Sequence, residues 1–197
     1  MSHSVSRPLP LADTPEIVLM TPDEPHELEA ARAIFRDYAA SLGIDLGFQN
    51  FDEELANLPG DYAEPRGALL LALVNVSDTA VPVDAQPLQR AQGGLAYVAG
   101  CCALRPLDTA DYPNAAEMKR LYVRPAFRGR HLGYDLANAI VGVAHDLGYG
   151  AMVLDTLASM EPANALYKSM GFRRADAYYE NPLPNVRYFV LDLTGLH

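Results

Sequence analysis

A cluster of basic residues near the middle of the chain has the clearest chemical potential. Between Glu117 and Arg130 the chain holds five of its 15 Lys and Arg residues and one acidic residue. The five are Lys119, Arg120, Arg124, Arg128 and Arg130. The pattern predicts a strand, then R-G-R-H-L-G at the start of an amphipathic helix. Free N–H groups and the positive dipole meet at a helix N-terminus, which favours an anion site suited to phosphate. The charges alone would also fit a helix N-terminus exposed to solvent, at which the Arg residues only make the surface more soluble.

Several other kinds of chemistry find no support in the sequence. It contains no G-x-x-x-x-G-K-[ST] loop, no G-x-S-x-G elbow, and no G-x-G-x-x-G after a strand. The five His residues show no metal-ligand spacing with one another or with the two cysteines, so we expect no metal. Cys101 and Cys102 are adjacent in an apolar segment, which predicts small buried side chains with reduced thiols.

Composition limits the class of protein further. The chain has 197 residues, half of them hydrophobic, and a net charge of -10, which fits one globular domain. An acidic balance disfavours duplex DNA and anionic lipid as partners, because both need a cationic surface. The apolar stretch 67–76 is far shorter than the roughly 20 residues of a membrane helix. The N-terminus lacks the pattern of a signal peptide, and we expect a soluble cytoplasmic protein.

Hydrophobic periodicity predicts the elements that would position the basic cluster. We expect strands at 16–20, 67–76, 93–104, 117–123, 151–157 and 186–193. Helices are expected at 26–42, 51–58, 132–147 and 161–170. Residues 1–15 should form a flexible arm, and 77–91 should form a loop between two hairpin strands. This alternation predicts an α+β fold with three layers, α/β/α.

The order of these segments resembles the acetyl-CoA-binding core of the GNAT superfamily of N-acetyltransferases. The similarity covers about residues 93–193 and includes E-M-K-R-L-Y-V-R-P, R-G-R-H-L-G and N-A-L-Y-K-S-M-G-F. It implies one domain over residues 16–197. It also implies a mixed, mostly antiparallel sheet, with one splayed strand pair and helices on both sides.

The resemblance implies a set of residues that bind acetyl-CoA. Its pantetheine arm would lie along the backbone of Leu121, Tyr122 and Val123. Its pyrophosphate would be wrapped by Arg128, Gly129, Arg130, His131, Leu132 and Gly133. His131 replaces the first glycine of the family motif, at a cost of about 1 kcal/mol if its φ is positive and little if its φ is helical. Met160 stands where many members carry an Asn that contacts the cofactor, and Asn164 lies at another helical phase.

The resemblance also suggests catalytic roles for two side chains. Glu117 matches a Glu that serves some members as general base through water; alternatively it is a solvated strand-edge residue beside Lys119. Tyr167 matches the family tyrosine that often protonates the coenzyme A sulfur; alternatively it packs the helix. The backbone N–H of Leu121 or a neighbour would stabilise the oxyanion.

The resemblance implies transfer of an acetyl group to a primary amine of a small molecule or peptide, directly within a ternary complex. The acidic first 66 residues favour a cationic acceptor by electrostatic steering. Tyr178, Tyr179 and Tyr188, with Glu180 and Asn181, could form the acceptor pocket or the contact of a homodimer. The alternative is a non-catalytic acyl-CoA-binding or interaction module, which His131 and Met160 favour.

Overall fold

The computed structural model describes residues 17–75, 86–89, 94–109 and 111–195. The predicted arm, residues 1–15, lies outside this part of the chain, as does most of the predicted loop. The strands are β1 (Ile17–Met20), β2 (Ala68–Val74), β3 (Gln86–Gln89), β4 (Leu95–Leu107), β5 (Ala115–Val123), β6 (Ala151–Leu157), β7 (Arg173–Ala175) and β8 (Val186–Asp192). The α-helices are α1 (Pro25–Leu42), α2 (Phe51–Asn57), α3 (Leu132–Asp146) and α4 (Glu161–Ser169), with short 3-10 turns η1 (Gly47–Gln49), η2 (Gly60–Tyr62) and η3 (Pro125–Phe127).

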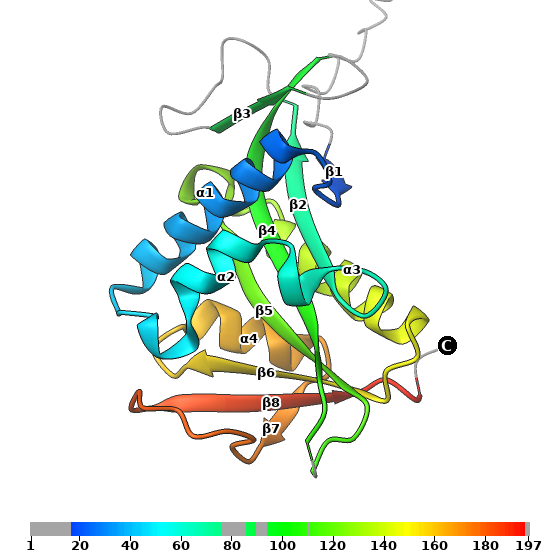
Figure 1. Cartoon of the computed structure of the whole chain (residues 1–197). Helices are drawn as coiled ribbons and strands as arrows, with labels where there is room; N and C mark the ends of the chain where they lie inside the picture. Colours follow the sequence, from blue (N-terminus) through cyan, green and yellow to red (C-terminus); the bar gives the residue numbers. More distant parts are fainter. Residues whose placement is uncertain (1–16, 76–85, 90–93, 110, 196–197) are drawn as a thin grey trace, which may run out of the picture.

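The strands form one mixed sheet in the order β1-β2-β4-β5-β6-β8-β7, with β3 paired to β4. The β5–β6 pair is parallel, and the other described pairs are antiparallel. In Figure 1, β2, β4 and β5 run up the picture while β6 and β8 run across it. The predicted mixed, mostly antiparallel sheet is confirmed.

The parallel strands β5 and β6 separate soon after they meet. Their pairing runs only from Ala115 opposite Ala151 to Glu117 opposite Val153. Beyond these pairs β5 continues to Val123 and β6 to Leu157 without further strand pairing. The predicted splayed pair is therefore confirmed, and it opens the sheet in the middle of the molecule.

Two apolar cores cover the two faces of the sheet. Helices α1 and α2 pack on one face, and α3 and α4 lie on the other (Figure 1). Strand β2 contributes to both cores, with Leu69, Leu71 and Leu73 on the α1 face and Leu70, Ala72 and Val74 on the α3 face. Burial of both faces explains why this strand is a continuous apolar run. The three-layer prediction is confirmed.

Two short strands depart from the prediction. Residues 86–89, expected in a loop, form β3, and β7 was not expected at all. They hold four and three residues, too few for an alternating pattern to be recognised, and β3 contains Pro87, which argues against a strand. No helix in the described part of the chain is both long and apolar enough to span a bilayer.

Candidate active site

A β-bulge at Arg120 shapes the strand that borders the opening. Cys101 of β4 pairs with Tyr122 and Ala103 pairs with Lys119, so β5 holds one extra residue. Arg120 accommodates it with a left-handed backbone, φ 59°. Its buried guanidinium binds both carboxylate oxygens of Glu54 in α2, at 2.9 and 2.6 Å. The bulge is thus fixed to helix α2 by a bidentate ion pair.

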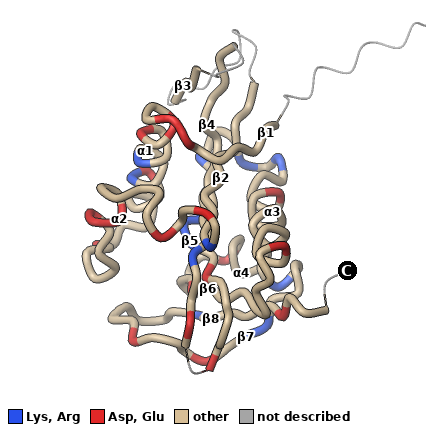
Figure 2. The backbone as a smooth tube through the Cα atoms, turned by 45° about the vertical axis from the view of Figure 1, so that its right-hand side comes forward, with Lys and Arg blue, Asp and Glu red and all other residues tan. Residues whose placement is uncertain are grey.

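Two more members of the basic cluster are also used in ion pairs. The Arg124 guanidinium, at the end of β5, donates to Asp37 of α1 at 2.6 Å and to the Val98 carbonyl at 2.7 Å. Lys119 Nζ lies 3.1 Å from Asp155 of β6. In Figure 2, Lys and Arg positions (blue) lie along β5, and Asp and Glu positions (red) lie on α1 and α2. Three of the five basic residues are therefore paired with acidic side chains of the same chain, which corrects the interpretation of the cluster as a single anion site.

Arg128 and Arg130 remain on the loop that leads into α3. Gly129 and His131 both have positive φ, 79° and 60°, so His131 adopts the left-handed conformation expected of the glycine it replaces. Within the described chain, no backbone carbonyl accepts from the N–H groups of residues 129–134. The loop thus offers several free donors at a helix start, as the phosphate prediction requires.

The C-terminal half of β5 presents backbone groups to the opening. The Arg124 N–H bonds to Ala99 of β4, so the N–H and C=O of Val123 point the other way, where β6 has diverged. Here Arg128 Nε donates to the Val123 carbonyl at 2.9 Å. Leu121, Tyr122 and Val123 are all half-buried. This edge can accept an extended ligand once Arg128 moves away.

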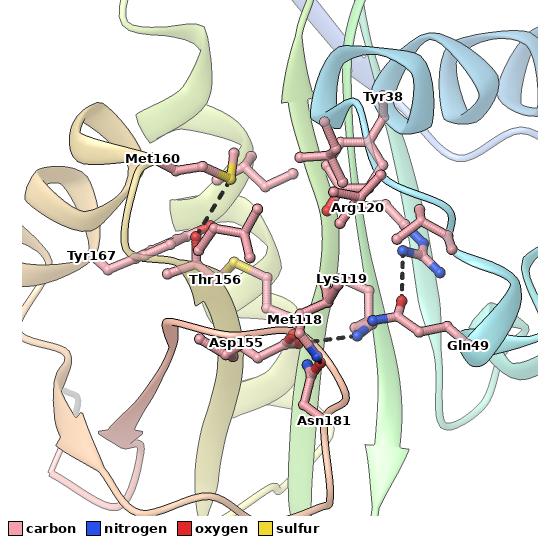
Figure 3. A pocket seen from close by; sticks show the side chains of 17 residues that line it. Tyr38, Gln49, Met118, Lys119, Arg120, Asp155, Thr156, Met160, Tyr167 and Asn181 are labelled. Carbon is pink, nitrogen blue, oxygen red and sulfur yellow. Dashed lines mark hydrogen bonds and ion pairs between the residues drawn. The ribbon is translucent and has the colours of Figure 1, made fainter.

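A narrow cavity of about 50 Å³ lies where β5 and β6 separate (Figure 3). Its polar lining includes Lys119, Asp155, Thr156, Tyr167 and Asn181. Leu121 also lines it, beside apolar side chains from the α1–η1 connection and the β7–β8 loop. The cavity therefore joins the edge of β5 to the helix that carries Tyr167.

Tyr167 lies at the wall of this cavity. Its ring packs against Phe172 and Phe189, and the residue is 6% exposed. Burial raises the pKa of its hydroxyl well above the usual range, so the hydroxyl stays protonated at neutral pH. No hydrogen-bond partner for it is found in the described chain. The Tyr167 ring therefore packs in the core, and its hydroxyl is also able to donate a proton.

Glu117 is not solvated, and it does not line the cavity of Tyr167. It is 1% exposed, and its carboxylate accepts from Arg105 Nε at 2.7 Å, the Tyr178 hydroxyl at 2.9 Å and Lys119 Nζ at 3.4 Å. It lines a neighbouring cavity of about 310 Å³. The solvated alternative is therefore wrong, and the base role stays a prediction.

Asp155 is a candidate that the sequence analysis missed. Its Oδ1 faces Lys119 and its Oδ2 accepts from the Tyr179 hydroxyl at 2.9 Å, while Asn181 Nδ2 donates to that hydroxyl at 2.6 Å. Its side chain is 14% exposed and lines the same cavity as Tyr167. An acid inside the apolar strand M-V-L-D-T-L was the available signal.

Two tyrosines of the β7–β8 loop pack together with one of β8. Tyr178, Tyr179 and Tyr188 lie with ring centroids 5.3 to 5.8 Å apart. Tyr178 and Tyr179 line the cavity of Glu117, together with Glu180, which supports the pocket interpretation of this cluster. A homodimer contact stays a prediction.

Asn164 has a structural task. Its Nδ2 donates to the carbonyls of Leu157 and Met160, and its Oδ1 accepts from Arg187. The amide thus joins the end of β6 to the start of α4. Met160 precedes α4, and its sulfur lies 3.7 Å from the Thr156 hydroxyl.

The two cysteines are free and fully buried, and burial raises the pKa of Cys101 to about 12. In the described residues, no group of three or more His, Cys, Asp or Glu side chains is arranged to hold a metal ion.

Comparison with known proteins gives consistent matches. Residues 85–172 match the Acetyltransferase (GNAT) family. An uncharacterized N-acetyltransferase of Schizosaccharomyces pombe is 40% identical over 170 residues, covering 86% of this chain and 91% of that protein. Another from Dictyostelium discoideum is 29% identical over 216 residues, covering 81% and 91%.

Solved structures share the fold. An acetyltransferase of the GNAT family from Staphylococcus aureus has a TM-score of 0.64 at 17% identity, covering 90% of this chain and 99% of that one. The protein yncA of Salmonella typhimurium, whose structure holds its cofactor acetyl-CoA, has a TM-score of 0.59 at 16% identity, covering 90% and 94%.

Proposed function

Because the chain belongs to the GNAT family of acetyltransferases, we propose that it transfers an acetyl group from acetyl-CoA to a primary amine of a small molecule or peptide, directly in a ternary complex. The observation that carries the proposal is the opening between β5 and β6, beside a loop of free N–H groups. We also propose a cytoplasmic location, since the two cysteines are reduced thiols.

The residues around the opening fit acetyl-CoA as the donor. The N–H groups of residues 129–134, with Arg128 and Arg130, would bind its pyrophosphate. The edge of β5 at Leu121, Tyr122 and Val123 would bond to its pantetheine arm, much as an added strand would. Arg128 would leave the Val123 carbonyl and turn towards the phosphates. When bound, the donor supplies an activated acetyl thioester.

The chemistry requires three proton transfers, for which this chain offers a carboxylate and the Tyr167 hydroxyl. The acceptor enters as an ammonium ion and gives one proton to a carboxylate. Its nitrogen then bonds to the acetyl carbon as the carbon–sulfur bond breaks. The Tyr167 hydroxyl gives its proton to the sulfur and takes the remaining excess proton from the nitrogen. Glu117 is the base predicted from the sequence, and a second carboxylate is argued for below.

Calorimetric titration of the protein with acetyl-CoA and with free coenzyme A tests the donor site. We expect binding in about the micromolar range for the wild type. The double variant Arg128→Ala, Gly133→Ala should lose it. A Cβ at Gly133 would lie 3.8 Å from Leu166 and 3.9 Å from Val123, an ordinary contact, so the variant should fold. Failure of the wild type to bind would contradict the proposal.

The alternative is an acyl-CoA-binding or interaction module without turnover, favoured by the side chain that His131 places in a loop where the family has glycine. Release of coenzyme A thiol, measured over a library of primary amines, separates the two functions. Tight binding without thiol release for any amine would favour the module.

A further inference from the structure

Two carboxylates lie where β5 and β6 separate, buried Glu117 and half-buried Asp155, and they line different cavities. Glu117 lines the larger cavity with Arg105 and Tyr178. Asp155 is the one carboxylate among the described residues that line the cavity of Tyr167. Figure 3 shows Asp155 on β6 facing Lys119 on β5. An amine that reacts beside Tyr167 would therefore meet Asp155 first.

The two carboxylates also differ in the contacts that they already make. Glu117 accepts three hydrogen bonds and is 1% exposed. Asp155 accepts two, one on each oxygen, and its side chain is 14% exposed. A carboxylate offers about four lone-pair positions, so Asp155 can accept a further donor from the cavity.

Lys119 shows what kind of ligand Asp155 binds. Its Nζ is an alkylammonium 3.1 Å from Asp155 Oδ1 and 3.4 Å from Glu117 Oε1. If another ammonium takes the place on Asp155, Lys119 keeps Glu117 as its partner. The exchange leaves no buried charge without a partner, which keeps its free-energy cost small.

The rest of the cavity wall indicates what the ammonium is attached to. Apolar side chains line the cavity from the end of α1 and the connection to η1, from the β7–β8 loop and from the start of β8: Leu42, Ile44, Leu46, Leu183 and Val186. The cations that line the cavity, Lys119 and Arg120, already have acidic partners. The wall therefore suits an apolar group next to the amine better than an anionic one.

We infer that Asp155 binds the acceptor ammonium and takes its proton, and that the acceptor is a primary amine carried on an apolar chain. The inference rests on the proposed function. One N–H bond breaks, the proton bonds to an Asp155 oxygen, and the nitrogen keeps the electron pair with which it attacks the acetyl carbon. Asp155 returns the proton to water when the product leaves. Tyr179 positions the carboxylate through its bond to Oδ2.

A binding experiment tests the ammonium site without turnover. Pentylamine at pH 7, which is pentylammonium, is titrated into the protein bound to coenzyme A, and the amide signals of Thr156 and Leu157 are followed by NMR. We expect Asp155→Asn to weaken binding about tenfold or more. Glu53→Gln, which removes an exposed charge on α2, should change it less than about twofold. Pentan-1-ol, with no charge, should bind equally to the wild type and to Asp155→Asn.

A second variant guards against misfolding as the cause of a loss. Lys119→Gln removes the competing cation but keeps a hydrogen-bond donor, so pentylammonium should bind more tightly, by about threefold or more. A gain in affinity cannot result from a damaged fold. Equal affinity of the wild type and Asp155→Asn, or no binding by the wild type, would overturn the inference. The titration with acetyl-CoA decides the proposed function separately.

Turnover gives a readout for the proton transfer. With an alkylamine acceptor, Asp155→Asn should lower kcat about 100-fold at pH 7, and the defect should shrink above about pH 10, where the amine deprotonates in water. Glu117→Gln should show no such convergence. If the kcat of Glu117→Gln approaches that of the wild type above about pH 10 and the kcat of Asp155→Asn does not, Glu117 is the base and the inference fails.

Discussion

Replacing His131 by Gly should stabilise the protein. His131 has φ 60° and ψ 6°, its side chain is exposed, and the described chain shows no hydrogen bond to its ring. The left-handed conformation costs a residue with a Cβ about 1–2 kcal/mol. Gly would remove this cost, but its greater freedom in the unfolded chain lowers the free energy of unfolding by about 0.5–1 kcal/mol. We expect His131→Gly to raise the free energy of unfolding by about 0.5–1 kcal/mol.

Urea unfolding measures this difference. With a slope of roughly 2–3 kcal/mol per molar urea, the midpoint of His131→Gly should rise by about 0.2–0.5 M with the slope unchanged. His131→Ala is the matched control, because it removes the same ring but keeps the Cβ, and its midpoint should stay near that of the wild type. If Ala raised the midpoint as much as Gly, the strain would lie in the ring and not in the backbone. A lower midpoint for Gly would refute the reasoning altogether.

Three further predictions concern residues of the core and the site. Glu54→Gln leaves the buried Arg120 without its carboxylate and should lower the free energy of unfolding by about 3 kcal/mol, measured in urea. Tyr167→Phe should lower kcat about 100-fold while the calorimetric Kd for acetyl-CoA stays the same, because only a proton donor is lost. The pKa of the Cys101 thiol is about 12 in the folded protein and about 9 in the unfolded chain. The protonated thiol therefore contributes fully to the free energy of unfolding below pH 9, and this contribution is lost as the pH rises towards 12. Between pH 9 and pH 10 the free energy of unfolding should fall by about 1 kcal/mol more for the wild type than for Cys101→Ala, as measured by urea unfolding at each pH.

The main elements of the fold could be predicted because their patterns are long. Helix α3 was expected at 132–147 and spans Leu132–Asp146, since its apolar residues repeat over four turns. Strand β2 was expected as a buried strand from its apolar run. The structure adds β3 and β7, which are strands because they pair with β4 and β8. Pairing with another segment leaves no pattern in the short strand's own sequence.

The chemistry of the site was less predictable because charged residues find their partners far away in the chain. Arg120 binds Glu54, 66 positions earlier, and Arg124 binds Asp37, 87 positions earlier. The local sequence alone assigns both to an anion site. Asp155 was missed for the same reason, since its partner Lys119 lies 36 positions away. A local excess of one charge therefore does not identify its ligand until the acids that contact it from distant parts of the chain have been counted.

The bulge in β5 explains why this strand can hold so many charges and still border an opening. Met118 faces the apolar α3 side of the sheet, so regular alternation would place Arg120 there too, where a guanidinium has no partner. The left-handed turn at Arg120 moves it to the α2 side, beside Glu54. Leu121 then returns to the α3 side, and the bend accompanies the separation of β5 from β6. Arg120 thus pairs its charge with Glu54 of α2 and also shapes the edge of β5 at which the donor is proposed to bind. Disruption of the Arg120–Glu54 ion pair should therefore lower both the free energy of unfolding and the affinity for the donor.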